Sequence, residues 1–145
     1  MKTIHIEVVS AEARILSSKA AFVVAPGEQG DIGILPGHQP LMSRLRPGEL
    51  RLVPPEGPEE IYYLSGGYLE VLPRLVSVLA DTVLRAEAID AERALAAQRE
   101  AAAMLKRGVI GIDYAEAKAQ LARATAQLRV LEDIRKRKRK GSPAR

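Results

Sequence analysis

Few residues in this 145-residue chain are of the types that perform catalysis, and they form no known catalytic motif. The two histidines are His5, in a strand-like pattern, and His38, in a glycine-rich segment that also contains Asp31. An aspartate and an imidazole can act as an acid–base pair, but no activated nucleophile or orienting partner accompanies them. Cysteine is absent, which excludes disulfides and thiolate metal sites and is consistent with a reducing compartment. We therefore predict no catalytic residue and no metal site.

Residues 30–41 combine turn-forming residues with large aliphatic ones. The turn formers are Gly30, Gly33, Pro36 and Gly37, and the aliphatic residues are Ile32, Ile34 and Leu35. This composition predicts a backbone that turns sharply more than once while the aliphatic side chains remain available for burial. In a chain without a catalytic motif, such a segment is typical of a rigid docking loop rather than of an active site.

The net charge of +4 is divided unevenly along the chain. All 18 acidic residues but only 15 of the 22 basic residues precede position 135, and residues 135–145 contain the remaining bases. The body is therefore mildly acidic, which argues against a folded basic face for nucleic acid, and no aromatic platform for stacking bases is visible. No apolar run approaches the roughly 18 residues that span a bilayer. Membrane association is expected only through partners.

Apolar residues recur at every second position in the first half of the chain, as in Ile4, Ile6 and Val8. Short alternating runs separated by Pro and Gly turns predict half-buried antiparallel strands in a two-layer sandwich or flattened barrel. The sequence offers no crossover helix between strands, so a parallel pairing is not expected. Gly66 and Gly67 are expected to provide a positive φ or a close sheet approach, which is an architectural role.

A helical periodicity begins near Asp90, which can cap a helix over residues 91–107 that Gly108 ends. Asp113 is expected to open a second helix, with Glu116 completing a capping box. The second helix carries an apolar seam of Tyr114, Ala117, Leu121, Ala124, Leu128 and Leu131, and the first offers Ala94, Ala97, Ala101 and Met104. Alanine seams allow close helix approach but bury little area, so they predict an antiparallel hairpin with weak tertiary packing.

These patterns predict an α+β protein in three parts. An N-terminal antiparallel β-sandwich is expected over residues 1–87, and a C-terminal antiparallel two-helix hairpin over residues 88–134. Residues 135–145 are expected to form a basic, flexible tail, because six adjacent cations repel one another and should fray the helix end. Gly141, followed by Ser and Pro, should end any helix that reaches it.

Three segments, residues 30–38, 64–71 and 78–81, resemble the epsilon subunit of bacterial F-type ATP synthase. The resemblance covers nearly the whole chain in order. It implies a non-catalytic central-stalk subunit whose sandwich grips the gamma subunit and rests on the ring of c subunits. It also implies a hairpin that folds against the sandwich or extends along gamma into the catalytic head of alpha and beta subunits, where it blocks ATP hydrolysis. The implied location is the cytoplasmic face of the bacterial inner membrane, held there by the complex.

The same resemblance assigns candidate contact residues in the sandwich. It places Asp31 and His38 in a loop that faces the c ring, where an acid and an imidazole can meet polar ring loops. A turn-capping aspartate and a solvent-facing histidine remain the alternative. The residues leave open whether the hairpin is compact or extended at rest and which ion the complex translocates.

Residues 89–94 match an Ile/Leu-Asp-x-x-Arg-Ala pattern through which some family members bind ATP. The resemblance implies weak regulatory ATP binding through Asp90, Arg93 and Arg123, with no cofactor required. Gln127 and Leu84 depart from the pattern, because basic and acidic residues respectively are expected there. The alternative is that Asp90 is a helix cap and Arg93 a surface charge.

The extended hairpin of the family passes near an acidic segment of the catalytic beta subunits. The resemblance therefore implies salt-sensitive contacts from Arg123, Arg129, Arg135, Lys136, Arg137 and Lys138. A solvated tail is the alternative, and a free-standing module that binds RNA or anionic lipid through this tail is a rival function.

Overall fold

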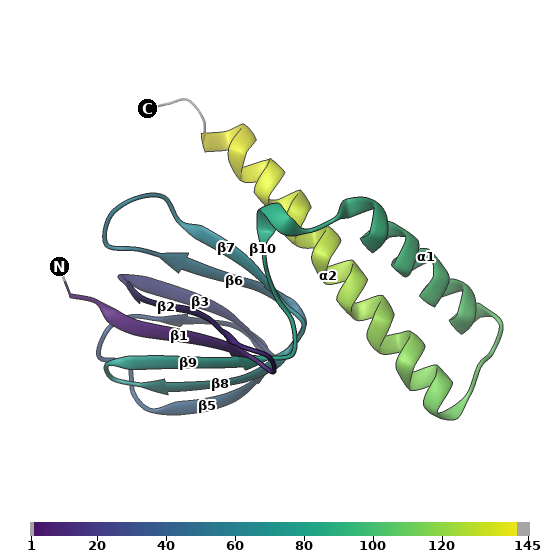
Figure 1. Ribbon diagram of the computed structural model, residues 1–145, viewed down its shortest axis with the longest axis horizontal. Coiled ribbons are helices and arrows are strands. Elements are labelled where there is room, and N and C mark those ends of the chain that lie inside the picture. The colour runs from purple at the N-terminus through teal and green to yellow at the C-terminus, as the bar shows by residue number, and fades with distance from the viewer. Residues whose placement is uncertain (1, 142–145) are drawn as a thin grey trace. The chain divides into compact units, whose positions relative to one another are not determined.

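The computed structural model describes residues 2–141 and divides the chain into two compact units, residues 1–85 and 86–145. The first unit is built from strands and the second from helices (Figure 1). The strands are β1 (Ile4–Ser10), β2 (Arg14–Ala20), β3 (Phe22–Gly27), β4 (Gly30–Ile34), β5 (Leu41–Leu45), β6 (Gly48–Val53), β7 (Glu60–Leu64), β8 (Gly67–Leu72), β9 (Leu75–Ala80) and β10 (Val83–Arg85).

The strands form two layers that meet through β3. One layer has the order β4-β3-β6-β7-β10, and the other has the order β5-β8-β9-β1-β2. Gly27 of β3 pairs with Leu45 of β5, and this pairing joins the two layers. The alternating pattern read from the sequence thus produces the predicted sandwich.

One strand pair departs from the expected antiparallel arrangement. β1 and β9 run parallel, with Ile6 opposite Val76 and Val8 opposite Val78. The expectation that no parallel pair would form was wrong, because a helix is not the only connection long enough to allow one. Here strands β2 to β8 themselves carry the chain from β1 back to the start of β9.

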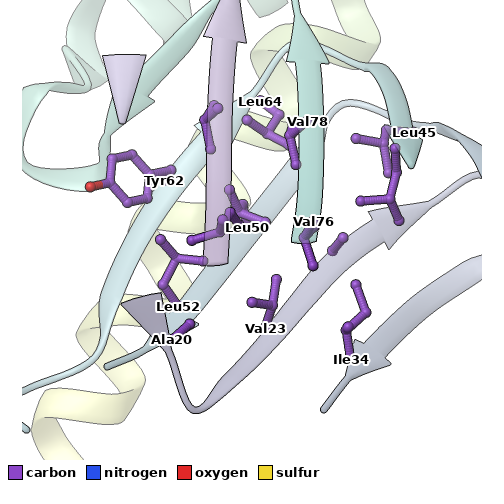
Figure 2. Packing of buried hydrophobic residues seen from close by; sticks show 14 of the residues in the cluster. Ala20, Val23, Ile34, Leu45, Leu50, Leu52, Tyr62, Leu64, Val76 and Val78 are labelled. Atoms are coloured by element: carbon purple, nitrogen blue, oxygen red, sulfur yellow. The ribbon is translucent and has the colours of Figure 1, made fainter. Parts of the chain in front are cut away.

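The core lies between the two layers. Ile4, Ile6 and Val8 of β1 are each at most 1 % exposed, as their period-two spacing predicted. Figure 2 shows part of the cluster, contributed by both layers: Ala20, Val23, Ile34, Leu45, Leu50, Leu52, Tyr62, Leu64, Val76 and Val78. Tyr62 lies at the edge with its hydroxyl directed away from the cluster, and this hydroxyl donates to Glu60 Oε1 at 2.8 Å. The only polar atom of that ring is therefore satisfied outside the core.

The second unit contains η1 (Ala86–Ala88), α1 (Ala91–Lys106) and α2 (Gly111–Gly141). Asp90 caps α1 as predicted, because its Oδ1 accepts hydrogen bonds from the backbone N–H groups of Glu92 at 3.1 Å and Arg93 at 3.2 Å. The predicted start of the second helix was three residues late, because a cap at Asp113 makes Tyr114 the first helical residue. α2 begins at Gly111, so Asp113 lies in its first turn, where a negative charge favours the helix dipole without capping it.

α2 continues to Gly141, which corrects the boundary expected at residue 135. Repulsion among the cations does not end the helix, and three effects oppose it. Lys and Arg have good helix propensity, and cations are favoured near a helix C-terminus. Lys136 also pairs with Glu132 at 3.5 Å, one turn earlier. The helix ends at the predicted Gly141, and residues 142–145 lie outside the described part of the chain.

The seam of the hairpin is formed by buried alanines, as predicted. They are Ala94 and Ala101 of α1, and Ala117 and Ala124 of α2. Two side-chain hydrogen bonds cross between the helices, from Gln98 Nε2 to Thr125 Oγ1 at 3.2 Å and from Gln120 Nε2 to the Ala97 carbonyl at 3.3 Å. Tyr114 was expected in the seam but is 47 % exposed. It lies in the first turn of α2, beside the loop that joins the helices, where α1 has already ended.

Candidate functional site

The glycine-rich segment is a strand for half of its length. Gly30–Ile34 is β4, which forms a hairpin with β3, so the docking loop expected over residues 30–41 is confined to residues 35–40. Ile34 is buried, but Leu35 is 60 % exposed, against the expectation that it would be available to the core. The backbone N–H of Gly37 donates to the Pro73 carbonyl at 2.8 Å, which ties this loop to the β8–β9 turn.

Asp31 forms an ion pair that the sequence did not reveal. Its Oδ1 lies 2.6 Å from an Arg46 guanidinium nitrogen, and the other terminal nitrogen of Arg46 donates to the Gly27 carbonyl. The Arg46 backbone N–H also donates to the Pro26 carbonyl at 2.9 Å. Asp31 therefore fastens the β3–β4 turn to the segment between β5 and β6, instead of capping its own turn. The Asp31 side chain is still 61 % exposed, and so it stays open to solvent or to a partner.

His38 lies beyond the other end of β4, near the β8–β9 turn, and does not act on Asp31. Its Nδ1 donates to the Gln39 carbonyl at 2.7 Å, since a carbonyl can only accept. Within residues 2–141 no hydrogen bond joins His38 to Asp31, so the acid–base pair considered from the sequence is not assembled. Asp31 is held by Arg46, and His38 is held by the Gln39 carbonyl.

An exposed apolar surface on the second layer was missed in the sequence. Met42 of β5, Tyr68 of β8 and Leu79 of β9 are 74 %, 53 % and 52 % exposed. Tyr68 pairs directly with Leu79 on one side and with Arg44 on the other, so these side chains share one face. Arg44 lies over the Tyr68 ring, 5.9 Å from its centroid. We call Met42, Tyr68 and Leu79 the outer patch. The sequence did contain a signal for this patch. On each of the three strands, one large apolar residue occupies a position that the alternating pattern assigns to solvent.

The three residues predicted to bind ATP lie on the hairpin. Asp90 Oδ1 already occupies the N–H donors of Glu92 and Arg93, which are the donors a phosphate would use. Arg93 is exposed on α1 and Arg123 is half-buried on α2. The two cross-hairpin hydrogen bonds place Arg123 about one helical turn along the axis from Arg93. The geometry therefore favours Asp90 as a cap and leaves the two arginines as the groups open to an anion.

Six consecutive basic residues, 135–140, lie within α2, and Arg129 precedes them on the same helix. Arg129, Arg135 and Lys138 are exposed, and Arg137 is half-buried. Lys136 forms the ion pair with Glu132, and its side chain is still 62 % exposed. We call residues 135–140 the basic segment. Its charges are presented on a helix rather than on a flexible tail.

Comparison with known proteins identifies both units. Residues 3–86 match the beta-sandwich domain of the ATP synthase Delta/Epsilon chain, and residues 87–132 match its long alpha-helix domain. The ATP synthase epsilon chain of Halorhodospira halophila is 50 % identical over 139 residues, which are 94 % of this chain and 98 % of the relative. The chain belongs to the ATP synthase delta/epsilon family. The epsilon chain of Nitrosococcus oceani is also 50 % identical, over 93 % of this chain and 96 % of its own.

Solved structures give the same fold. A chain of the Euglena gracilis mitochondrial ATP synthase OSCP/F1/c-ring structure superimposes with a TM-score of 0.71 at 23 % identity, over 92 % of this chain and 80 % of that one. A chain of the Tetrahymena thermophila mitochondrial ATP synthase central stalk and c-ring structure gives 0.62 at 11 % identity, over 90 % and 97 %.

Family membership confirms two expectations from the sequence. The fold is a β-sandwich followed by a helical hairpin, and the protein is an epsilon-type subunit of an ATP synthase rather than an enzyme by itself. The complex to which such subunits belong synthesises ATP. Among the helices in residues 2–141, none is long and apolar enough to cross a membrane.

Proposed function

We propose that the sandwich of this epsilon-family subunit binds the gamma subunit through the outer patch and couples it to the c ring. The observation that carries the proposal is the exposure of Met42, Tyr68 and Leu79 on three adjacent strands. Clustered apolar side chains of this size are costly in water and are typical of protein interfaces. A stalk subunit needs such a surface, because it must hold a rotating partner without forming part of a catalytic site.

Asp31 at the start of β4 and His38 in the loop after β4 are our candidates for contact with the c ring. Asp31 keeps one carboxylate oxygen beyond its pairing with Arg46, and His38 keeps Nε2 beyond its bond to Gln39. Both are suited to the polar loops that a membrane-embedded ring presents to water. These contacts would hold the subunit peripherally at the cytoplasmic face of the bacterial inner membrane.

The hairpin is our candidate for restraint of ATP hydrolysis. Its α1–α2 seam is built on alanines, which bury little apolar area and let a helix pair re-pack at modest cost. The exposed cations Arg129, Arg135 and Lys138 fit an acidic surface of the catalytic beta subunits, and Arg123, Lys136 and Arg137 extend the same positive charge. Contacts with alpha and beta subunits would follow when the hairpin extends.

Weak ATP binding is a second role for the hairpin. Arg93 and Arg123 would supply the phosphate contacts, while Asp90 organises the start of α1 that carries Arg93. With the helix N–H donors already used by Asp90, the site offers two guanidinium groups and no backbone cradle. We therefore expect a weak affinity for ATP, so that the site is occupied only at high ATP concentrations.

The docking proposal is tested by measuring gamma binding to the full chain and to a Tyr68→Ser/Leu79→Ser variant. Loss of two apolar contacts should weaken binding about tenfold or more. Ile15→Ser is the matched control, since Ile15 is also exposed, at 43 %, but lies on β2 outside the outer patch. Equal gamma affinity for wild type and the double variant would overturn the outer patch as the gamma site.

A further inference from the structure

A hollow of about 340 Å³ opens at one end of the outer patch. It lies where β5, β8 and β9 meet the turns at the end of the sandwich. The residues around it are Glu28, Arg44, Leu45, Ser65, Gly66, Gly67, Tyr68, Leu79, Ala80 and Asp81. Tyr68 and Leu79 belong both to the hollow and to the outer patch. A partner that binds the outer patch therefore also contacts the hollow, because the two surfaces are continuous.

The walls of the hollow are fixed by backbone contacts. A Cβ at Gly67 would lie 1.9 Å from the Leu79 carbonyl oxygen, so only glycine permits this approach of β8 to β9. Ser65 and Thr82 exchange two hydrogen bonds, from Ser65 N–H to the Thr82 carbonyl at 3.1 Å and from Thr82 N–H to Ser65 Oγ at 2.9 Å. The hollow is thus formed before any partner arrives, and little ordering is needed on binding.

The charge around the hollow is negative. Glu28 and Asp81 are exposed, and neither forms an ion pair with another side chain of residues 2–141. Arg44 is the one cation in the lining, and it already lies over the face of the Tyr68 ring. Two carboxylates against one guanidinium leave an uncompensated negative charge. The Tyr68 ring and Leu79 add an apolar wall beside those carboxylates.

We propose that this hollow receives a lysine or arginine side chain that the gamma subunit projects beside the outer patch. The inference rests on the proposed function, because it takes gamma as the occupant of the patch. A long basic side chain suits both parts of the hollow: its methylene groups pack on Tyr68 and Leu79, and its charge meets Glu28 and Asp81. A small inorganic cation would leave the apolar wall unused and find only two carboxylates.

The test is the affinity of gamma for the full chain and for a Glu28→Gln/Asp81→Asn variant over a salt series. The amide substitutions keep size and remove only charge, and both sites are exposed, so the fold should persist. We expect roughly three- to tenfold weaker binding at low salt, with the difference shrinking as salt screens the pair. Glu70→Gln is the control, because Glu70 lies on the outer face of β8 and does not line the hollow.

The two failures can be told apart. If gamma binds neither wild type nor variant at any ionic strength, the proposed docking function fails and the hollow loses its assigned partner. If gamma binds wild type and the double variant equally at every ionic strength, docking stands and the inference about the hollow is overturned. Equal weakening by Glu70→Gln would also overturn it, because the effect would then be general to the charge of the face.

Discussion

Arg46 lies 2.6 Å from the Asp31 carboxylate and also donates to the Gly27 carbonyl, so one guanidinium group fastens two turns of the sandwich. Asp31 was expected to serve a partner through its charge. In the structure, the Asp31 carboxylate pairs with Arg46 of the same chain. Any contact of Asp31 with the c ring must therefore share this carboxylate with Arg46.

This relationship predicts unequal effects of removing the two partners. Arg46→Ala removes the ion pair and the bond to the Gly27 carbonyl, and should lower the free energy of unfolding by about 1–2 kcal/mol. Asp31→Ala removes only a largely exposed ion pair, and should lower it by less than about 1 kcal/mol. Urea denaturation of the purified chain measures both. Equal losses would show that the Gly27 bond contributes nothing.

Gly67 should be far less replaceable than a glycine in open space. A methyl group at Gly67 collides with the Leu79 carbonyl oxygen at 1.9 Å, whereas one at Gly57, whose φ of +97° is also positive, meets nothing within 4 Å. Gly57→Ala should cost about 1 kcal/mol from backbone strain alone, and Gly67→Ala at least 2 kcal/mol more. Thermal unfolding of the two variants, measured in parallel, tests this difference in stability. Similar melting temperatures would contradict the close approach of β8 to β9.

Asp90 should protect the start of α1 from opening. Asp90→Ala removes the acceptor for the N–H groups of Glu92 and Arg93, and should destabilise this end of the helix by about 0.5–2 kcal/mol. Hydrogen exchange at residues 91–95 should accelerate accordingly. Asp113→Ala is the control, since Asp113 only favours the dipole of α2 and should change exchange there by a smaller factor. A larger effect at Asp113 would restore it as the cap.

Features of the fold that local sequence patterns control could be predicted from the sequence. Features that depend on contacts between distant residues, or on competing interactions, could not. Period-two alternation and alanine spacing predicted the sandwich and the hairpin. The parallel pairing of β1 with β9 could not be predicted, because it joins Ile6 to Val76 across most of the sandwich sequence. The glycine-rich segment was interpreted as a loop because Gly30, Gly33, Pro36 and Gly37 are turn formers, yet pairing with β3 makes residues 30–34 a strand.

The candidate site was predictable only in part. Asp90 as a cap followed from its position before an apolar-periodic run, and the structure has it there. The partner of Asp31 could not be found, because Arg46 lies fifteen residues away on another turn. The basic segment was expected to fray because repulsion was taken to outweigh the helix dipole, and the Lys136–Glu132 pair was not anticipated. The roles proposed for Asp31, His38, Arg93 and Arg123 remain predictions.

The basic segment should act through charge. Replacing all six cations of residues 135–140 by Gln should raise ATP hydrolysis by the assembled complex, most strongly at low salt, because contacts with an acidic surface are lost. The control replaces Lys2 and Lys19, basic residues of the sandwich, by Gln. Identical hydrolysis rates for wild type and the six-Gln variant at every ionic strength would leave the segment as a solvated helix end.

The central claim is that the sandwich docks the subunit while the hairpin restrains hydrolysis. The most direct measurement compares ATP synthesis and ATP hydrolysis by membrane-bound complexes carrying the full chain or a chain truncated after Glu87. The sandwich holds its own core and should fold alone and join gamma. We predict that the truncated subunit assembles and supports ion-driven ATP synthesis while ATP hydrolysis rises. A truncated subunit that fails to join gamma, or hydrolysis that stays at the level of the full chain, would contradict the account.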